Sequence, residues 1–475
     1  MKETSRFYSS LGLLVLLNAV IKPLWIFGID RQVQNIVGSA EYGTYFSILN
    51  LSMVLVFLLD WGLTVFYNRQ LSANDTNTLD QAGSFIVVKL LFSLLYAALI
   101  FCIAYITGIK RKEIVIYVVA IQVLSSFFVF FRAVITSQQW FRTDAWLSVL
   151  DKLLMILLCG AMLYFPALMG GIDIERFLLL QTACMAFAVA TALIILLLKK
   201  FPFGIKKILP DRQVFRAAIP FAVIVLLMSF HSRIDGFLLE RISGATEAGK
   251  YAAAYRLLDA ANVLGFLFAS FLLPYITRRW KERKDISDVI LNIRHLLVMA
   301  GVTISVIILF MAQWIQRILY HQEDLSSIEV LQWCLAAITG YYLIHVYGTV
   351  LTATGNIAAF SYITLVSVLI NLTLNLILIP SIGAKGSCVA ALISQGFGGL
   401  ATMWYANRKL NIRLDIRSLL IYFFTGALLC GFLYVCNELQ AGKWLMITGA
   451  GLITLVMLWI TRLDDLNIRK LVARH

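Results

Sequence analysis

The sequence predicts an all-α polytopic membrane protein with about 14 transmembrane helices, arranged as two six-helix lobes and a C-terminal helix pair. Of its 475 residues, 60% are hydrophobic and only 14% are charged, whereas soluble proteins are about 45–50% apolar and about 25% charged. Apolar stretches of about 20 residues, the length of a helix that spans a bilayer, recur along the whole chain. Two short sequence patterns also repeat six predicted helices apart.

The predicted spans are runs of apolar residues separated by charged or turn-forming segments. At about 20 residues per span plus short loops, a chain of this length has room for roughly 12–15 helices. The expected spans are 10–29, 44–66, 84–107, 114–135, 146–165, 177–198, 217–239, 251–276, 291–312, 329–352, 358–380, 386–405, 418–436 and 444–461. Because fourteen is even, both termini are expected on one side of the membrane.

The basic residues predict which side that is. The net charge is +14, from 40 Lys and Arg against 26 Asp and Glu. Loops on the side of the termini hold 25 of the 40, including two near the fourth loop and six from Arg278 to Arg294, and the opposite loops hold 10. Cytoplasmic loops are enriched in Lys and Arg, so both termini are predicted to be cytoplasmic. The cluster at 110–112 is the one contrary signal.

Two short internal sequence repeats indicate a duplicated architecture. Residues 38–45 (GSAEYGTY) and 244–251 (GATEAGKY) share Gly, Glu, Gly and Tyr at an offset of 206, and the Ser-Val-Leu at 148–150 recurs at 367–369. Both pair helix n with helix n+6, which gives repeats of the same orientation, as in many transporters. The expected parts are an N-lobe of six helices at 1–200, a basic cytoplasmic linker at 201–216, a C-lobe of six helices at 217–410, and a final helix pair with a cytoplasmic tail at 411–475.

Reaction chemistry is not visible in the sequence. The seven cysteines lie in apolar runs without a CxxC pair, and the five histidines lack metal-ligand spacing. A GxxxxGK[ST] loop and a GxSxG elbow are both absent, which argues against an ATP-driven pump and a common hydrolase. We therefore expect a transporter, not an enzyme, with no catalytic residue, metal or cofactor. Since most of the positive charge orients helices, no nucleic-acid partner is expected.

Five basic residues lie inside predicted spans, apart from two that lie within four residues of a span end and are counted with the loops. A charge at the bilayer centre costs at least about 2.5–3.5 kcal/mol, so it normally faces a partner or a wet cavity. Together they predict an anion-binding cavity between the lobes, most naturally for phosphate groups. The alternative is interhelical salt bridges and lysines whose ammonium groups reach the interface. The five are Lys22, Lys89, Lys152, Arg233 and Arg256.

Acidic and histidine side chains in spans are the candidates for proton coupling. They are Asp60, Asp235, Asp259 and His231. Asp259 lies three residues from Arg256, on the same helix face, where the two charges can neutralise each other. The sequence offers no feature that selects one of the four.

Polar residues and one proline in spans form a third group of candidates. Asn50, Asn371 and Asn375 are candidates for contact with sugar hydroxyls, although helix-to-helix hydrogen bonds are the more frequent role of such residues. Pro23 follows Lys22 and removes a backbone hydrogen bond. The first span is therefore expected either to bend and gate transport or to carry a static kink.

Eight short motifs follow one another along nearly the whole chain. They are EYGTY at 41–45, DWGL at 60–63, RIDGFLL at 233–239, GKYAAAYRL at 249–257, LP at 273–274, LTATGN at 351–356, NLTLNLILIP at 371–380 and GAKG at 383–386. In order and spacing they resemble the polysaccharide-unit flippases, of the O-antigen type, in the multidrug/oligosaccharidyl-lipid/polysaccharide (MOP) exporter superfamily.

The resemblance implies a bacterial inner-membrane protein that moves a lipid-linked oligosaccharide, carried on undecaprenyl pyrophosphate, from the cytoplasmic to the periplasmic leaflet. It also implies alternating access, with the pyrophosphate on the cations of an inward-open cleft, the sugars in a wet cavity and the lipid tail in the bilayer. The implied partners are this substrate, the bilayer, a polysaccharide polymerase and glycosyltransferases of polysaccharide or lipopolysaccharide synthesis.

Three other functions remain open at this stage. A lipid II flippase for peptidoglycan would need a similar cationic cavity. A MATE-like multidrug antiporter would need buried carboxylates for cationic drugs, whereas the charges without same-helix partners here are basic. A membrane glycan polymerase or ligase would normally need a long outer loop with catalytic groups, and the longest predicted outer loop, 313–328, is short.

Overall fold

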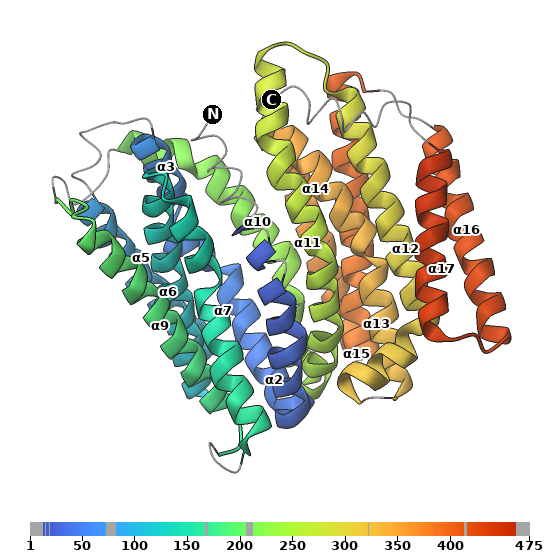
Figure 1. The fold of residues 1–475 in the computed structure, drawn as a ribbon, viewed down its shortest axis with the longest axis horizontal. Coiled ribbons are helices and arrows are strands. Elements are labelled where there is room, and N and C mark those ends of the chain that lie inside the picture. The colour runs from blue at the N-terminus through green and yellow to red at the C-terminus, as the bar shows by residue number, and fades with distance from the viewer. Residues whose placement is uncertain are drawn as a thin grey trace. The chain divides into compact units, whose positions relative to one another are not determined.

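The computed structural model describes residues 13–14, 16–18, 20–72, 82–166, 170–205, 212–321, 323–412 and 416–461 (Figure 1). Every regular element in these ranges is a helix, and no strand occurs in them, which confirms the all-α class. The chain divides into two compact units, residues 1–249 and 250–475.

The first unit is a bundle in which α6 packs along α9 and α3, and α10 packs along α2. Its elements are η1 (Leu24–Asp30), α2 (Arg31–Val54), η2 (Val56–Leu59), α3 (Leu63–Ser72), α5 (Ala82–Ile106), α6 (Lys112–Ser137), α7 (Phe141–Tyr164), α9 (Ile174–Leu198) and α10 (Arg212–Ser243). The sequence repeat assigns α10 to the second lobe, whereas its contacts with α2 place it in the first unit.

The second unit is organised around α12, which contacts α13, α14, α16 and α17. Its elements are α11 (Ala245–Lys281), which begins just before the boundary, α12 (Ser287–Tyr320), α13 (Leu325–Ala336), α14 (Ile338–Ala353), α15 (Ile357–Leu410), α16 (Ile416–Glu438) and α17 (Lys443–Ile460). The last two helices pair with each other (Figure 1), and their residues Leu429, Leu433 and Met446 form a buried apolar core with Met311 of α12.

Eleven helices of the described ranges are long and apolar enough to span a membrane. They contain twelve of the fourteen predicted spans, because α15 holds both 358–380 and 386–405 and changes direction at Ile382 and Gly383, where the backbone is not helical. The length and number of these helices make the chain a multi-pass membrane protein. The first predicted span, 10–29, lies partly outside the described residues.

The second predicted span, 44–66, is broken in the structure. The helix α2 ends at Val54, and Trp61 and Gly62 both have positive φ before α3 begins. The carboxylate of Asp60 accepts hydrogen bonds from the backbone N–H and the hydroxyl of Thr64, which stabilise the start of α3. Irregular backbone at membrane depth is tolerated where protein groups satisfy it.

The two copies of the glycine motif lie against each other, in a contact that we call the glycine seam. A Cβ atom on Gly43 would overlap the carbonyl oxygen of Ala245, and one on Gly249 would overlap that of Ser39. At the repeat offset of 206, residue 43 corresponds to 249 and residue 39 to 245, so the two contacts are reciprocal. The side-chain amide of Gln34 also donates to the Gly249 carbonyl at 2.9 Å. The seam is therefore locally two-fold symmetric.

The remaining repeated positions also have matching conformations. Gly38 and Gly244 both adopt positive φ, at 83° and 92°, where residues with a side chain are strained. Tyr45 and Tyr251 are both buried. The repeated Gly and Tyr residues thus have the same local structural roles in both copies.

Candidate functional site

The first predicted span changes its helical pitch directly after Lys22. Pro23 lacks a backbone N–H, and the π-helix η1 follows it. The buried indole of Trp25 stacks on Phe177 of α9, with ring centroids 5.9 Å apart and planes 7° apart. Because π-helical turns are rare and frequently lie at functional sites, this segment is a candidate site element.

Three cations gather beside this segment, and we call Lys22, Arg132 and Lys152 the basic cluster. Lys22 is exposed and lies within electrostatic range of Arg132, Lys152 and Asp151. The Nζ atom of Lys152 is 3.2 Å from Asp151 Oδ2 and 4.9 Å from the ring centroid of Trp25. Among the described residues, no carboxylate lies within 4.0 Å of the Lys22 ammonium group. The cluster therefore has a cation that is available to a ligand.

Arg132 of α6 is held by a bidentate ion pair with Asp144 of α7. Its Nε lies 2.7 Å from Asp144 Oδ1 and its Nη2 lies 3.1 Å from Oδ2. The guanidinium carbon also lies 5.6 Å from the ring centroid of Phe128. The third nitrogen, Nη1, has no hydrogen bond to any residue in the described ranges. Arg132 is thus fixed in direction by one carboxylate and retains donor capacity for a second anion.

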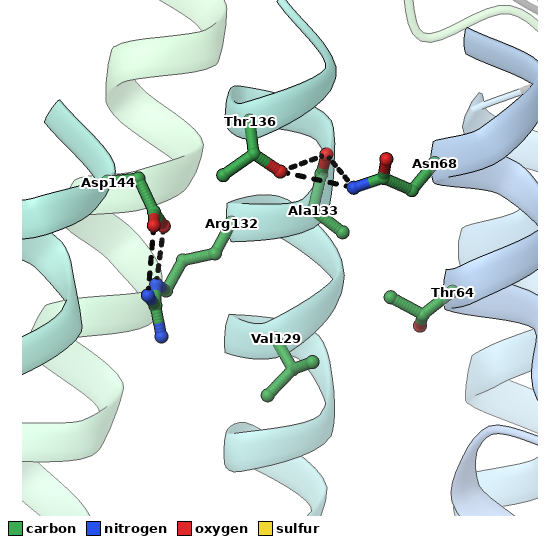
Figure 2. Close-up of a pocket in the computed structure, with 7 residues that line it drawn as sticks. All are labelled: Thr64, Asn68, Val129, Arg132, Ala133, Thr136 and Asp144. Atoms are coloured by element: carbon green, nitrogen blue, oxygen red, sulfur yellow. Dashed lines mark hydrogen bonds and ion pairs between the residues drawn. The ribbon is translucent and has the colours of Figure 1, made fainter. Parts of the chain in front are cut away.

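A pocket of about 480 Å³ opens beside Arg132, between α3, α6 and α7 (Figure 2). Its lining residues, which we call the polar pocket, are Thr64, Asn68, Val129, Arg132, Ala133, Thr136 and Asp144. Figure 2 shows Asn68 reaching across to α6, where its amide donates to the Ala133 carbonyl at 2.8 Å and to the Thr136 hydroxyl at 3.1 Å. Small-molecule pockets commonly measure about 300–1,000 Å³, so this one has room for a polar ligand group.

Lys89, a predicted anion ligand, is paired inside the first unit. Its ammonium group lies 2.5 Å from Asp60 Oδ1 and donates to the Leu59 carbonyl at 3.3 Å. The lysine side chain is 1% exposed and the aspartate 30%. The ion pair thus joins α5 to the break between η2 and α3. Such an interhelical salt bridge is the alternative to a role of Lys89 in anion binding.

The three predicted asparagines are buried at contacts between helical segments. Asn50 of α2 lies against Gly236 of α10, where a Cβ atom would come within 2.7 Å of its amide nitrogen. Asn371 donates to the Ser394 hydroxyl at 3.3 Å, across the two halves of α15, and Asn375 donates to the Asn371 carbonyl at 2.9 Å. Contact with sugars remains a prediction for these residues.

The other candidates lie on α10 and α11. His231 and Asp235 of α10 are buried and Arg233 is half-buried in the first unit, while Arg256 and Asp259 of α11 are half-buried in the second unit. The structure therefore brings together only part of the predicted set. Lys22 lies near Lys152, and Lys89 pairs with Asp60.

Arg132 and the polar pocket are absent from the sequence-based candidates. The charge count assigns Arg132 to the fourth loop, because it lies three residues before the end of the predicted span 114–135, whereas α6 continues to Ser137. The spacing of Arg132 and Asp144 in the sequence is a signal that points to this ion pair. Arg132 and Asp144 lie twelve residues apart on either side of a short connection, so adjacent antiparallel helices bring them to the same level.

Two family matches cover much of the chain. Residues 10–280 match the family described as Polysaccharide biosynthesis protein, which is more than half of the sequence. Residues 220–377 match the MatE family. No curated protein matches the chain significantly by sequence.

Solved structures of several transporters have the same fold. The inward-closed structure of the lipid II flippase MurJ superposes with a TM-score of 0.70 at 13% identity, covering 97% of this chain and 99% of MurJ. An inward-facing multidrug resistance MATE family transporter of the MOP superfamily gives 0.64 at 13% identity, over 85% of this chain and 98% of the transporter. An outward-facing structure of a multidrug resistance MATE family transporter superposes with a TM-score of 0.59 at 12% identity. The match covers 85% of this chain and 94% of the transporter. These likenesses establish the fold.

Proposed function

Because this chain belongs to the polysaccharide biosynthesis protein family, we propose that it is a flippase for lipid-linked oligosaccharides. It moves a repeat unit carried on undecaprenyl pyrophosphate from the cytoplasmic to the periplasmic leaflet of a bacterial inner membrane, by alternating access. The observation that carries the proposal is the basic cluster beside the polar pocket in the first unit.

The charges of the basic cluster favour a phosphate ligand. Asp151 and Asp144 each hold one cation, Lys152 and Arg132 respectively. Lys22 adds a third positive charge close to both of them. Like charges at this range repel unless an anion lies between them, and a pyrophosphate supplies that anion with several acceptor oxygens.

The polar pocket supplies a hydroxyl-rich neighbourhood for the sugar part of the substrate. Thr64, Asn68 and Thr136 offer hydroxyl and amide groups beside Arg132. In the predicted topology α3 and α6 end, and α7 begins, at the cytoplasmic side. A substrate that enters from the cytoplasmic leaflet meets this pocket first, with its lipid tail in the bilayer and its sugars in water.

The other predicted residues are assigned to later stages of transport. We assign Arg233 and Arg256 to pyrophosphate contact on the outer half of the route. Asp235, Asp259 and His231 are the remaining candidates for proton coupling.

Opening and closing of the route need elements that move. Pro23 and the π-helix η1 are the proposed bending point of the first span. The buried asparagine contacts of α2 and α15 are proposed as hinge contacts. Both termini are proposed to be cytoplasmic, where glycosyltransferases that build the repeat unit work, while a polymerase acts on it outside.

A lipid II flippase is the second candidate function. The likeness to MurJ extends over nearly the whole chain. Lipid II carries the same kind of pyrophosphate, so the basic cluster serves either substrate. The two candidates differ in the sugars and not in the charge, so the transport assay must include both lipids.

Transport in proteoliposomes tests the proposal. Purified protein is expected to move a labelled undecaprenyl-pyrophosphate oligosaccharide across the bilayer. The variant Lys22→Ala is expected to slow transport about ten- to a hundredfold, since a charge-assisted hydrogen bond contributes about 1.5–3 kcal/mol. Because the Lys22 side chain is exposed, the Tm of the Lys22→Ala variant should equal that of the wild-type protein. Faster movement of lipid II than of polysaccharide units would select the second candidate.

The matched control is Lys385→Ala. Lys385 lies in the predicted outer loop before the span 386–405, and its ammonium group pairs with Glu329 at 3.0 Å in the second unit. The Lys385→Ala variant is expected to transport the substrate at the wild-type rate. Movement of neither lipid by the wild-type protein, or full transport by Lys22→Ala, would contradict the proposed site.

A further inference from the structure

Arg294 of α12 is a buried cation to which the described part of the chain offers no counterion. The residue is 4% exposed. Within the described ranges, no carboxylate lies within 4.0 Å of its guanidinium group, and its Nε and Nη2 atoms are buried without a hydrogen-bond partner. Buried arginines are almost always paired, because an uncompensated charge in a low-dielectric interior is unfavourable. This residue therefore indicates a site for a negatively charged group.

The side chains around Arg294 have unused polar atoms as well. Tyr347 of α14 and Tyr422 of α16 place their hydroxyls beside the guanidinium group. The Tyr347 hydroxyl lies within reach of both Arg294 and Asn407, on α15, but forms a well-aligned hydrogen bond with neither, and both amide atoms of Asn407 are buried without one. Three side chains from three helices thus leave five buried polar atoms without a well-aligned hydrogen bond at one place. Native proteins satisfy nearly all such atoms, so this cluster points to a ligand.

The available groups match an oxyanion. The guanidinium nitrogens, the Asn407 amide nitrogen and the Tyr347 hydroxyl are all hydrogen-bond donors. A planar guanidinium fork pairs bidentately with a carboxylate or a phosphate. A cation would be repelled by Arg294, and a neutral ligand would leave the charge uncompensated.

We propose that Arg294, Tyr347 and Asn407 form a buried oxyanion site, which binds one carboxylate or phosphate group and ties α12 to α14 and α15. The neighbouring residues extend the connection to the C-terminal helix pair. The Nδ1 atom of His295 lies 3.4 Å from the hydroxyl of Tyr422 on α16, and its Nε2 atom lies 3.1 Å from the hydroxyl of Thr461, which follows α17. The site belongs to the second unit and shares no residue with the basic cluster, so it does not depend on the proposed transport function.

Two kinds of group are candidates for the bound oxyanion. One is a phosphate group, from solution or from a lipid. The other is a carboxylate of the chain itself. Asp415 directly precedes α16, and Asp464 and Asp465 follow Thr461 closely in sequence, although all three are outside the described residues.

Thermal unfolding of the purified full-length protein tests whether an anion is bound. The variant Arg294→Met removes the charge and keeps much of the volume. If an oxyanion is bound, this change leaves the anion unpaired and lowers Tm by several degrees. If Arg294 is simply unpaired, removal of a buried charge raises Tm, and this result would overturn the proposal. Should the methionine variant not fold, Arg294→Lys keeps the charge, loses the fork, and is expected to lower Tm by less.

A second arm identifies the source of the anion. Inorganic phosphate is titrated at constant ionic strength against sodium chloride. A phosphate site gives a wild-type Tm that rises with phosphate concentration and an Arg294→Met variant that does not respond. A carboxylate of the chain gives no phosphate response. In that case Asp415→Asn, or Asp464→Asn with Asp465→Asn, lowers Tm as much as Arg294→Met, and the combined variant loses no more.

The matched control is Arg317→Met. Arg317 lies on the same helix but is 70% exposed and pairs with Glu323 at 3.1 Å. It is expected to leave Tm and its phosphate dependence unchanged. The absence of both a phosphate response and any coupling between Arg294 and the three aspartates would overturn the oxyanion site.

Discussion

The glycine seam and the polar pocket are two regions of the first unit with opposite packing. At the seam, Gly43 and Gly249 bring backbone against backbone, so that not even a methyl group fits between the segments. At the pocket, α3, α6 and α7 are held apart by polar side chains around a space of about 480 Å³.

The contrast shows how one bundle can be tight at one place and hollow at another. The seam lies on the predicted outer side, where its segments lead into the predicted spans 44–66 and 251–276, while the pocket lies on the predicted cytoplasmic side. Small residues let helices approach closely in membranes. Ion pairs instead keep helices apart, because charged side chains are long and need a polar environment.

The largest expected effect comes from the ion pair beside the pocket. The variant Asp60→Asn leaves the fully buried Lys89 ammonium group without its counterion, and loss of one partner of a buried pair costs about 3–5 kcal/mol. The reverse change, Lys89→Met, leaves an aspartate that is 30% exposed and hydrogen-bonded to Thr64. Unfolding of purified protein should therefore show a much larger loss of Tm for Asp60→Asn than for Lys89→Met.

The double variant sharpens this prediction. Asp60→Asn combined with Lys89→Met removes both charges and should be more stable than Asp60→Asn alone. Equal losses in the two single variants, or a double variant that is the least stable of the three, would show that the pair is hydrated and does not hold the break before α3.

The seam is expected to respond by a moderate amount. Gly43→Ala and Gly249→Ala each place a Cβ atom on a backbone carbonyl that cannot rotate away, and overpacking of this kind typically costs about 1–3 kcal/mol. Because the two contacts are reciprocal, the variants should lower Tm by similar amounts, and the double variant should lose less than the two together.

Gly431→Ala is the control for the seam. Gly431 lies within α16, and a Cβ atom there meets no atom within 4 Å. Alanine is the better helix former by about 1 kcal/mol, so this variant should keep or raise Tm. Seam variants that behave like Gly431→Ala would mean that the seam is not closed in the membrane.

The sequence was sufficient for the helices but not for their interruptions. Apolar length alone located the spans, because the bilayer requires about 20 residues whatever the side chains contact. The break between Val54 and Leu63 contains Asp60, which pairs with Lys89 of another helix. Hydropathy averages over such a break and predicts a continuous helix.

The candidate site was predictable only in part, for a related reason. The charge count assigned Arg132 and Arg294 to loops, since a cation near a span end can reach water at little cost. The structure instead pairs Arg132 with Asp144 and buries Arg294. Whether a cation reaches the interface or turns into the protein depends on neighbours from other helices, and one helix taken by itself does not contain that information.

The smallest expected effect is at Arg111, beside the outer side of the seam. Arg111 lies 3.1 Å from Glu41 and 3.2 Å from Glu175, which offsets part of the positive cluster at 110–112 that ran against the predicted topology. All three side chains are more than one-third exposed. Water and salt screen such pairs, so Arg111→Ala should lower stability by no more than about 1 kcal/mol, and the difference should vanish in high salt. Tm measured in low and high sodium chloride checks this, and a loss as large as that of Gly43→Ala would mean that the ion pairs, and not the glycines, hold the seam closed.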